Sequence, residues 1–61
     1  MQEGKYRVIK PIHVYDCIYG QLKLGLGVIV TIEDYGRAGV VGDYTFPAQL
    51  LQWSEGSLEW I

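Results

Sequence analysis

Alternating apolar and polar positions between Leu22 and Ile32 form the clearest pattern in the chain. Every even position is apolar, whereas the odd positions carry lysine, glycine, threonine or isoleucine. Because successive side chains of a strand point to opposite faces, this alternation predicts a half-buried strand with its even positions inward. The stretch is long for one straight strand, so we expect a bend at Gly25 and Gly27, as barrel corners require.

The residues before this stretch predict one strand and one loop. Residues Tyr6–Val14 are rich in β-branched side chains, which favours a strand. Pro11 lacks the N–H that a sheet needs, so this is an edge strand or one that breaks near Lys10. Residues Tyr15–Gln21 show no clear period and include aspartate and glycine, which indicates a loop.

The second half of the chain consists of short strand patterns separated by turn signals. Eight glycines against two prolines favour tight turns between strands. Pro47 suits the first position of a short helical turn, which is too short to be an independent helix. In chain order we expect a turn at 34–36, a third strand at Arg37–Gly42 that pairs with the second, a fourth strand at Tyr44–Phe46, one helical turn at Pro47–Leu51, a turn at Ser54–Ser57 and a closing strand at Leu58–Ile61 against the first.

Length and composition indicate a single small domain over residues 1–61. Cys17 is the only cysteine and His13 the only histidine, so no internal disulfide or zinc site is expected, and no metal or cofactor is predicted. The lone cysteine fits a reducing compartment. The sequence contains neither a signal-peptide pattern nor an apolar run of about 20 residues, so we expect a cytoplasmic location and no membrane partner.

The charge balance argues against a nucleic-acid partner. Five lysines and arginines face seven aspartates and glutamates, which gives a net charge of −2 and a pI near 5.0. Non-specific binding of nucleic acid depends on a basic surface that neutralises phosphates. Nucleic acid is therefore the less favoured partner.

The residues that could act in catalysis are few. A hydrolase would need His13 as its base, with Cys17, Ser54 or Ser57 as nucleophile. We favour ordinary structural roles for His13 and a partly buried Cys17. The carboxylates at 16, 33, 34 and 43 lie at expected turns, where aspartate bonds the local backbone. The Leu-Gly-Leu-Gly segment precedes a strand rather than a helix, so it is not a phosphate loop. We predict that the chain is not an enzyme.

The order of the expected elements resembles that of SH3-like barrels. The segment LKLGLGVIVTI (Leu22–Ile32) is similar to the stretch that leads out of the family's first long loop, and TFPAQLL (Thr45–Leu51) is similar to its aromatic, proline and helical-turn segment. The resemblance implies an all-β fold, a single five-stranded SH3-like barrel with one short helical turn near Pro47–Leu51.

In the family's peptide-binding members, proline-rich ligands lie on a loop aromatic, a third-strand tryptophan, a proline and a tyrosine near the helical turn. Tyr15 and Asp16 match the loop positions, and Pro47 matches the groove proline. The tryptophan is replaced in the segment Arg37–Val40, and the tyrosine by Leu50 or Leu51. Because polyproline recognition depends on an aromatic groove, the resemblance implies the fold and not that ligand.

The chain holds more aromatic side chains than its core needs. A small barrel encloses about a dozen side chains, which the apolar residues already supply. These are Val8, Ile12, Val14, the even positions from Leu22 to Ile32, Val40, Phe46 and Leu50. Seven aromatic residues remain, namely Tyr6, Tyr15, Tyr19, Tyr35, Tyr44, Trp53 and Trp60. They either cap the barrel and pair across strands, or form a contact surface, and both roles can hold together.

These observations predict a non-enzymatic protein–protein interaction module that docks on another protein or on copies of itself. The predicted contact residues are Tyr15, Tyr19, Tyr35, Tyr44, Trp53 and Trp60. The small size suggests an accessory subunit, or a small regulator or inhibitor, of bacterial or phage origin. The alternative is single-stranded nucleic-acid binding by aromatic stacking, with Lys5, Arg7, Lys10 and Arg37 on phosphates.

Overall fold

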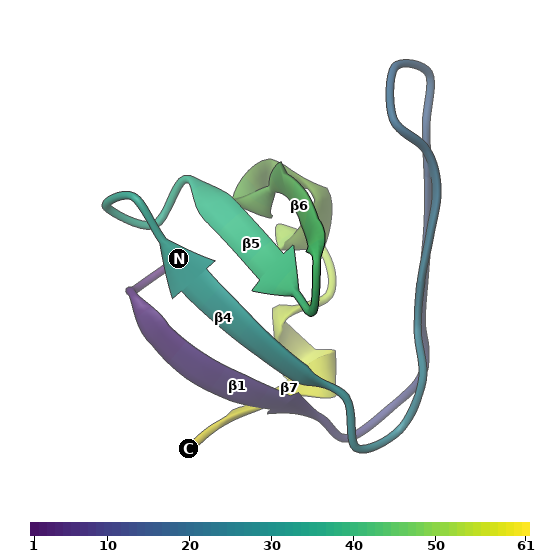
Figure 1. Cartoon of the computed structure of the whole chain (residues 1–61). Coiled ribbons are helices and arrows are strands. Elements are labelled where there is room, and N and C mark those ends of the chain that lie inside the picture. Colours follow the sequence, from purple (N-terminus) through teal and green to yellow (C-terminus); the bar gives the residue numbers. More distant parts are fainter.

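The computed structural model describes residues 1–61 and consists of seven strands and two short 3-10 turns. In chain order the elements are β1 (Gly4–Val8), β2 (Ile12–Asp16), β3 (Gly20–Leu24), β4 (Ile29–Glu33), β5 (Ala38–Val41), β6 (Tyr44–Pro47), η1 (Ala48–Leu51), η2 (Glu55–Ser57) and β7 (Leu58–Trp60). They form a five-stranded sheet, β6-β5-β4-β1-β7, and a two-stranded sheet, β2-β3 (Figure 1). All pairs are antiparallel.

The all-β class is confirmed, but the strand count differs from the prediction. The expected first strand divides into β1 and β2 at Ile9–Pro11, where Pro11 predicts a break. The expected loop Tyr15–Gln21 is instead largely the end of β2 and the start of β3. The five-stranded sheet is open, because its edge strands β6 and β7 do not pair with each other.

The predicted long strand Leu22–Ile32 is two strands joined by a turn. Val28 donates a backbone hydrogen bond to Gly25 at 3.3 Å, and Gly27 has a φ of +83°. The two glycines therefore make a full turn where the sequence pattern predicts a bend. The inward even face holds on both sides of the turn, but Leu26 at its tip is 66% exposed.

Pairing in the five-stranded sheet follows the predicted hairpin and closing strand. β4 and β5 form an antiparallel hairpin, with Ile32 opposite Gly39. β7 pairs with β1 of the same chain and places Trp60 opposite Tyr6. In Figure 1 the β2–β3 hairpin is the blue arm that extends away from this sheet at the right. Its base still contributes three side chains to the core, namely Ile12, Leu22 and Leu24.

The core is one cluster that joins both sheets to η1. Its members are Val8, Ile12, Leu22, Leu24, Val30, Ile32, Phe46, Ala48 and Leu51. Three expected core residues, Val14, Val28 and Val40, are only half-buried. Leu50 is also half-buried, because the buried positions of η1 are Ala48 and Leu51. Burying a large apolar side chain contributes about 1.5–3 kcal/mol, so this small cluster supplies most of the driving force for folding.

The turn between β4 and β5 has an unusual backbone that the N-terminal residues support. Asp34 and Tyr35 have φ values of +53° and +59°, as the central residues of a type I′ turn require. The Tyr35 N–H donates a hydrogen bond to the Glu3 carboxylate at 2.6 Å. The Met1 carbonyl packs against Gly36 so closely that no side chain would fit there. The structure contains no helix that is long and apolar enough to cross a membrane.

Candidate functional site

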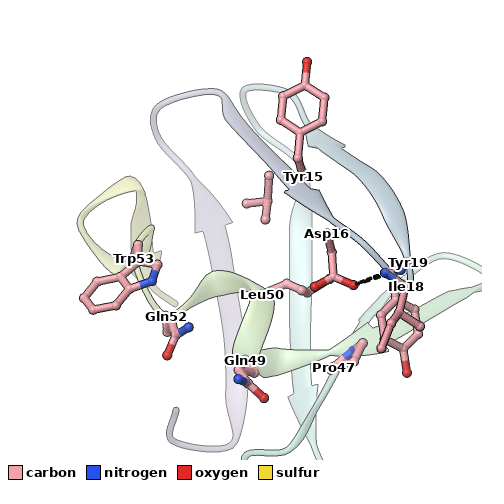
Figure 2. Close-up of a pocket in the computed structure, with 10 residues that line it drawn as sticks. Tyr15, Asp16, Ile18, Tyr19, Pro47, Gln49, Leu50, Gln52 and Trp53 are labelled. Carbon is pink, nitrogen blue, oxygen red and sulfur yellow. Dashed lines mark hydrogen bonds between the residues drawn. The ribbon is translucent and has the colours of Figure 1, made fainter.

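The main surface hollow lies between the tip of the β2–β3 hairpin and η1, and we call it the groove (Figure 2). Its volume is about 380 Å³. The hairpin forms one wall, and η1 with the residues around it forms the other. The lining residues are Val14, Tyr15, Asp16, Ile18, Tyr19, Pro47, Gln49, Leu50, Gln52 and Trp53.

The hairpin wall owes its shape to Asp16. Its Oδ2 accepts hydrogen bonds from the backbone N–H groups of Ile18 at 2.8 Å and Tyr19 at 2.9 Å. This is the turn chemistry expected of an aspartate, and it fixes the path of the tip. These hydrogen bonds close the backbone of the tip on itself, and the side chains of Tyr15 and Ile18 project into solvent. Tyr15 is 73% exposed and Ile18 is 79% exposed. The hairpin therefore presents apolar side chains to solvent instead of burying them.

The opposite wall follows from the single turn of η1. Pro47 is the last residue of β6 and the N-cap of η1, with an extended backbone at φ −65° and ψ 129°. The helical turn therefore begins at Ala48, and not at Pro47 as the sequence predicts. Ala48 and Leu51 face the core, three residues apart, so Gln49 and Gln52 point outward on the other side of the turn. Leu50 is half-buried and lines the groove.

Three of the six predicted contact residues come together in the groove, and three do not. Tyr15, Tyr19 and Trp53 all line it. Trp53 follows η1 and is 89% exposed. Tyr35 lies on the β4–β5 turn and is 87% exposed. Neither it nor the remaining two aromatic residues line the groove.

Tyr44 and Trp60 pack against other aromatic rings. The Tyr44 ring stacks on the buried Phe46, with centroids 5.9 Å apart and planes at 27°. The Trp60 ring meets Tyr6 edge to face, with centroids 5.1 Å apart and planes at 84°. It also lies over Gly4, where an added Cβ would be 2.5 Å from the indole. Trp60 therefore acts as a cross-strand partner of Tyr6, one of the two roles that the sequence leaves open, whereas Tyr44 stacks on a residue of its own strand, β6.

Several groove residues are absent from the contact set predicted from the sequence. Ile18 lies in the segment expected to be a featureless loop, and Leu50 is predicted as a core residue. Gln49 and Gln52 carry no pattern that separates them from other surface amides. Asp16 and Pro47 are groove positions only through the family resemblance. These residues form one site because the hairpin and η1, which are separated by residues 25–47 in the sequence, line the same hollow.

The groups considered for catalysis have other surroundings. His13 Nε2 lies 2.8 Å from Oε1 of Gln21, and its ring packs on Tyr15 with centroids 4.5 Å apart. Cys17 is a free, exposed cysteine at the hairpin tip, in contrast to the partly buried cysteine predicted. No group of three or more histidine, cysteine, aspartate or glutamate side chains is arranged to hold a metal ion.

The four cations of the nucleic-acid hypothesis do not share one strand or loop. Lys5 and Arg7 lie on β1, Lys10 lies in the loop after it, and Arg37 precedes β5. β4 separates β1 from β5 in the sheet. Arg7 is also engaged within the chain, because its Nη1 is 3.1 Å from Oε1 of Glu59.

Comparisons with protein-family models, curated proteins and solved structures found no match to this chain.

Proposed function

We propose that this chain is a non-enzymatic interaction module that binds an extended segment of a partner protein in the groove. The observation that carries the proposal is the convergence of exposed apolar side chains on one hollow. Tyr15, Ile18 and Trp53 all line the groove, and each is at least 73% exposed. Exposed clusters of aromatic and aliphatic residues mark binding sites, and tyrosine and tryptophan dominate binding energies at interfaces.

The proposal includes the class of fold. We propose an open SH3-like barrel, in which the β2–β3 hairpin stands for the first long loop of that family. The positions matched by the resemblance support this, because Tyr15, Asp16 and Pro47 line one hollow. The segment Arg37–Val40, and Leu50 or Leu51, stand where peptide-binding members have aromatic residues, so a polyproline ligand is not part of the proposal. A cytoplasmic regulator, inhibitor or accessory subunit from a bacterium or phage is the setting we propose.

The lining of the groove favours a protein ligand over a nucleic acid. No lysine or arginine lines it, and Asp16 contributes a carboxylate. Aromatic surfaces that bind single strands combine stacking with a positively charged path for the phosphates. The glutamine amides at 49 and 52 instead suit the backbone N–H and C=O groups of an extended peptide.

The test is selection of a random-peptide phage library on the immobilised protein, followed by calorimetry with the selected peptides. Trp53→Ala should weaken binding by about 30-fold, the loss typical of a central aromatic contact. Tyr35→Ala is the matched control, since Tyr35 is as exposed as Trp53 but does not line the groove. It should change affinity by less than about twofold.

Two outcomes would contradict the proposal. The first is a selection that yields no peptide with measurable affinity. The second is equal loss of affinity in Trp53→Ala and Tyr35→Ala, because binding would then not depend on the groove. Sedimentation of the free protein tests whether the groove binds a second copy of the chain. A mass that rises with concentration, and that falls in Trp53→Ala, identifies a second copy as the occupant of the groove.

A further inference from the structure

A second hollow of about 300 Å³ adjoins the groove on the other side of η1. Its lining residues are Met1, Gly36, Arg37, Pro47, Ala48, Gln49, Gln52 and Glu55. Pro47, Gln49 and Gln52 line both hollows, so they form a common wall. A ligand that crosses this wall occupies both hollows.

The second hollow differs from the groove in charge. Arg37 is its only lysine or arginine, whereas the groove has none. The Arg37 side chain makes no ion pair or hydrogen bond within the chain, although Glu55 lines the same hollow. The Asp16 carboxylate, in contrast, is already bonded to two backbone N–H groups of its own turn. Arg37 is therefore an unpartnered cation at the border of the groove.

The backbone around Arg37 holds it beside the common wall. The Arg37 carbonyl accepts a hydrogen bond from the Ala48 N–H at 2.8 Å, which ties it to the start of η1. The next residue, Ala38, pairs with Pro47 across β5 and β6. An extended peptide advances about 3.3 Å per residue, so a segment that leaves the groove over Pro47 comes beside Arg37 within a few residues.

We propose that the segment bound in the groove carries an aspartate or glutamate, a few residues from its apolar anchors, that pairs with Arg37. This inference rests on the proposed function and adds the chemistry of the ligand. A guanidinium binds a carboxylate through two parallel N–H···O bonds, which gives direction as well as affinity. The acidic residue thus fixes the direction in which the segment lies across the wall.

The experiment repeats the library selection on Arg37→Glu beside the native chain. Peptides selected on the native chain should share an acidic residue at a constant spacing from their apolar residues. Those selected on Arg37→Glu should carry lysine or arginine at that position. Lys5→Glu is the control, since it makes the same change of charge on β1, outside both hollows, and should select the same peptides as the native chain.

A second measurement uses one selected peptide and its acid-to-lysine counterpart. Arg37→Gln, which removes the charge without adding a carboxylate, should weaken the acidic peptide by about 3- to 10-fold and should not weaken its lysine counterpart, which no longer faces a like charge. Circular dichroism of each variant checks that the fold is retained. If the selected peptides require Trp53 but show no acidic position, or ignore Arg37→Glu, the inference is wrong and the proposed function stands. If no peptide binds at all, both are wrong.

Discussion

The two tryptophans of this chain lie in regions that use the same side chain in opposite ways. Trp60, on the edge strand β7, meets Tyr6 edge to face and covers Gly4. Trp53 follows η1 at the margin of the groove, is 89% exposed and forms no aromatic pair. About half of the Trp60 surface is therefore covered within the chain, since it is 52% exposed, whereas nearly all of the Trp53 surface is open.

Neighbouring residues, and not the aromatic side chains themselves, account for this difference. Gly4 has no Cβ, so the indole of Trp60 can lie on its backbone. The groove side chains belong to two separate walls. The Asp16 turn fixes the hairpin wall, and η1 fixes the opposite wall. The aromatic residues of this chain therefore include some that are partly covered by other rings and some, such as Trp53, that are almost fully open to a partner.

Phe46→Ala should have the largest effect, because the core beneath both regions depends on this ring. Phe46 is 2% exposed and contacts Gly39 so closely that an added Cβ would be 2.6 Å from the ring. Losing a buried phenylalanine costs about 3–5 kcal/mol, and a domain of this size has roughly 3–9 kcal/mol in total. We expect both regions to unfold together in urea, followed by circular dichroism.

Tyr44→Ala is the control for that variant, since Tyr44 stacks on Phe46 from the exposed side. It should cost about 1 kcal/mol or less. A Phe46→Ala protein with nearly native stability, or with separate transitions for the two regions, would show that they do not share one core.

Trp60→Ala should lower stability without affecting the groove. It removes an edge-to-face contact and uncovers Gly4 and Tyr6, so we expect a loss of about 1–2 kcal/mol in urea unfolding. Affinity for groove peptides should remain within about twofold of the native value. A large loss of affinity with unchanged stability would place Trp60 in the binding surface and remove the contrast with Trp53.

Much of the fold can be predicted from the sequence, because periodicity reports burial directly. The even positions Leu22, Leu24, Val30 and Ile32 are all core residues, as their alternation predicts. The β2–β3 hairpin cannot be predicted in this way, since its tip is built by a side-chain-to-backbone turn at Asp16 and has no apolar period.

The groove is harder to predict than the fold, because its members come from segments far apart in the chain. The alternation of apolar and polar residues predicts which face of a strand is buried, but it does not predict which loops lie next to each other in the fold. Tyr15 and Trp53 belong to one site only because the hairpin packs beside η1. Leu50 is assigned to the core from its apolarity, and the 3-10 turn places Leu51 there instead.

Tyr35→Gly should raise stability by about 0.5–1 kcal/mol, because glycine adopts a positive φ without steric cost. In a domain of this size that corresponds to a rise in Tm of roughly 2–8 °C by calorimetry. Tyr35→Ala keeps a Cβ in the same conformation and should show no such gain. Tyr35 belongs to neither tryptophan region, so unchanged peptide affinity in Tyr35→Gly is also expected, and a loss would extend the binding surface to the β4–β5 turn.

The smallest effect is expected from the ion pair between Arg7 and Glu59, which links β1 and β7 beside Trp60. Both side chains are about half exposed, and exposed pairs contribute about 0–1 kcal/mol. A double-mutant cycle with Arg7→Ala and Glu59→Ala should give a coupling energy below about 0.5 kcal/mol. A larger value would mean that this edge of the sheet is held by charge as well as by the Trp60 contact.

The most direct test follows the two indole N–H signals in a ¹⁵N–¹H NMR spectrum while a selected peptide is added to the native chain. The chain has two tryptophans, so the spectrum contains one signal for each region, and the Trp53→Ala and Trp60→Ala variants assign them. We predict that the Trp53 signal moves to saturation with the peptide and that the Trp60 signal stays in place. Movement of the Trp60 signal with a stationary Trp53 signal would contradict the assignment of the groove as the binding site.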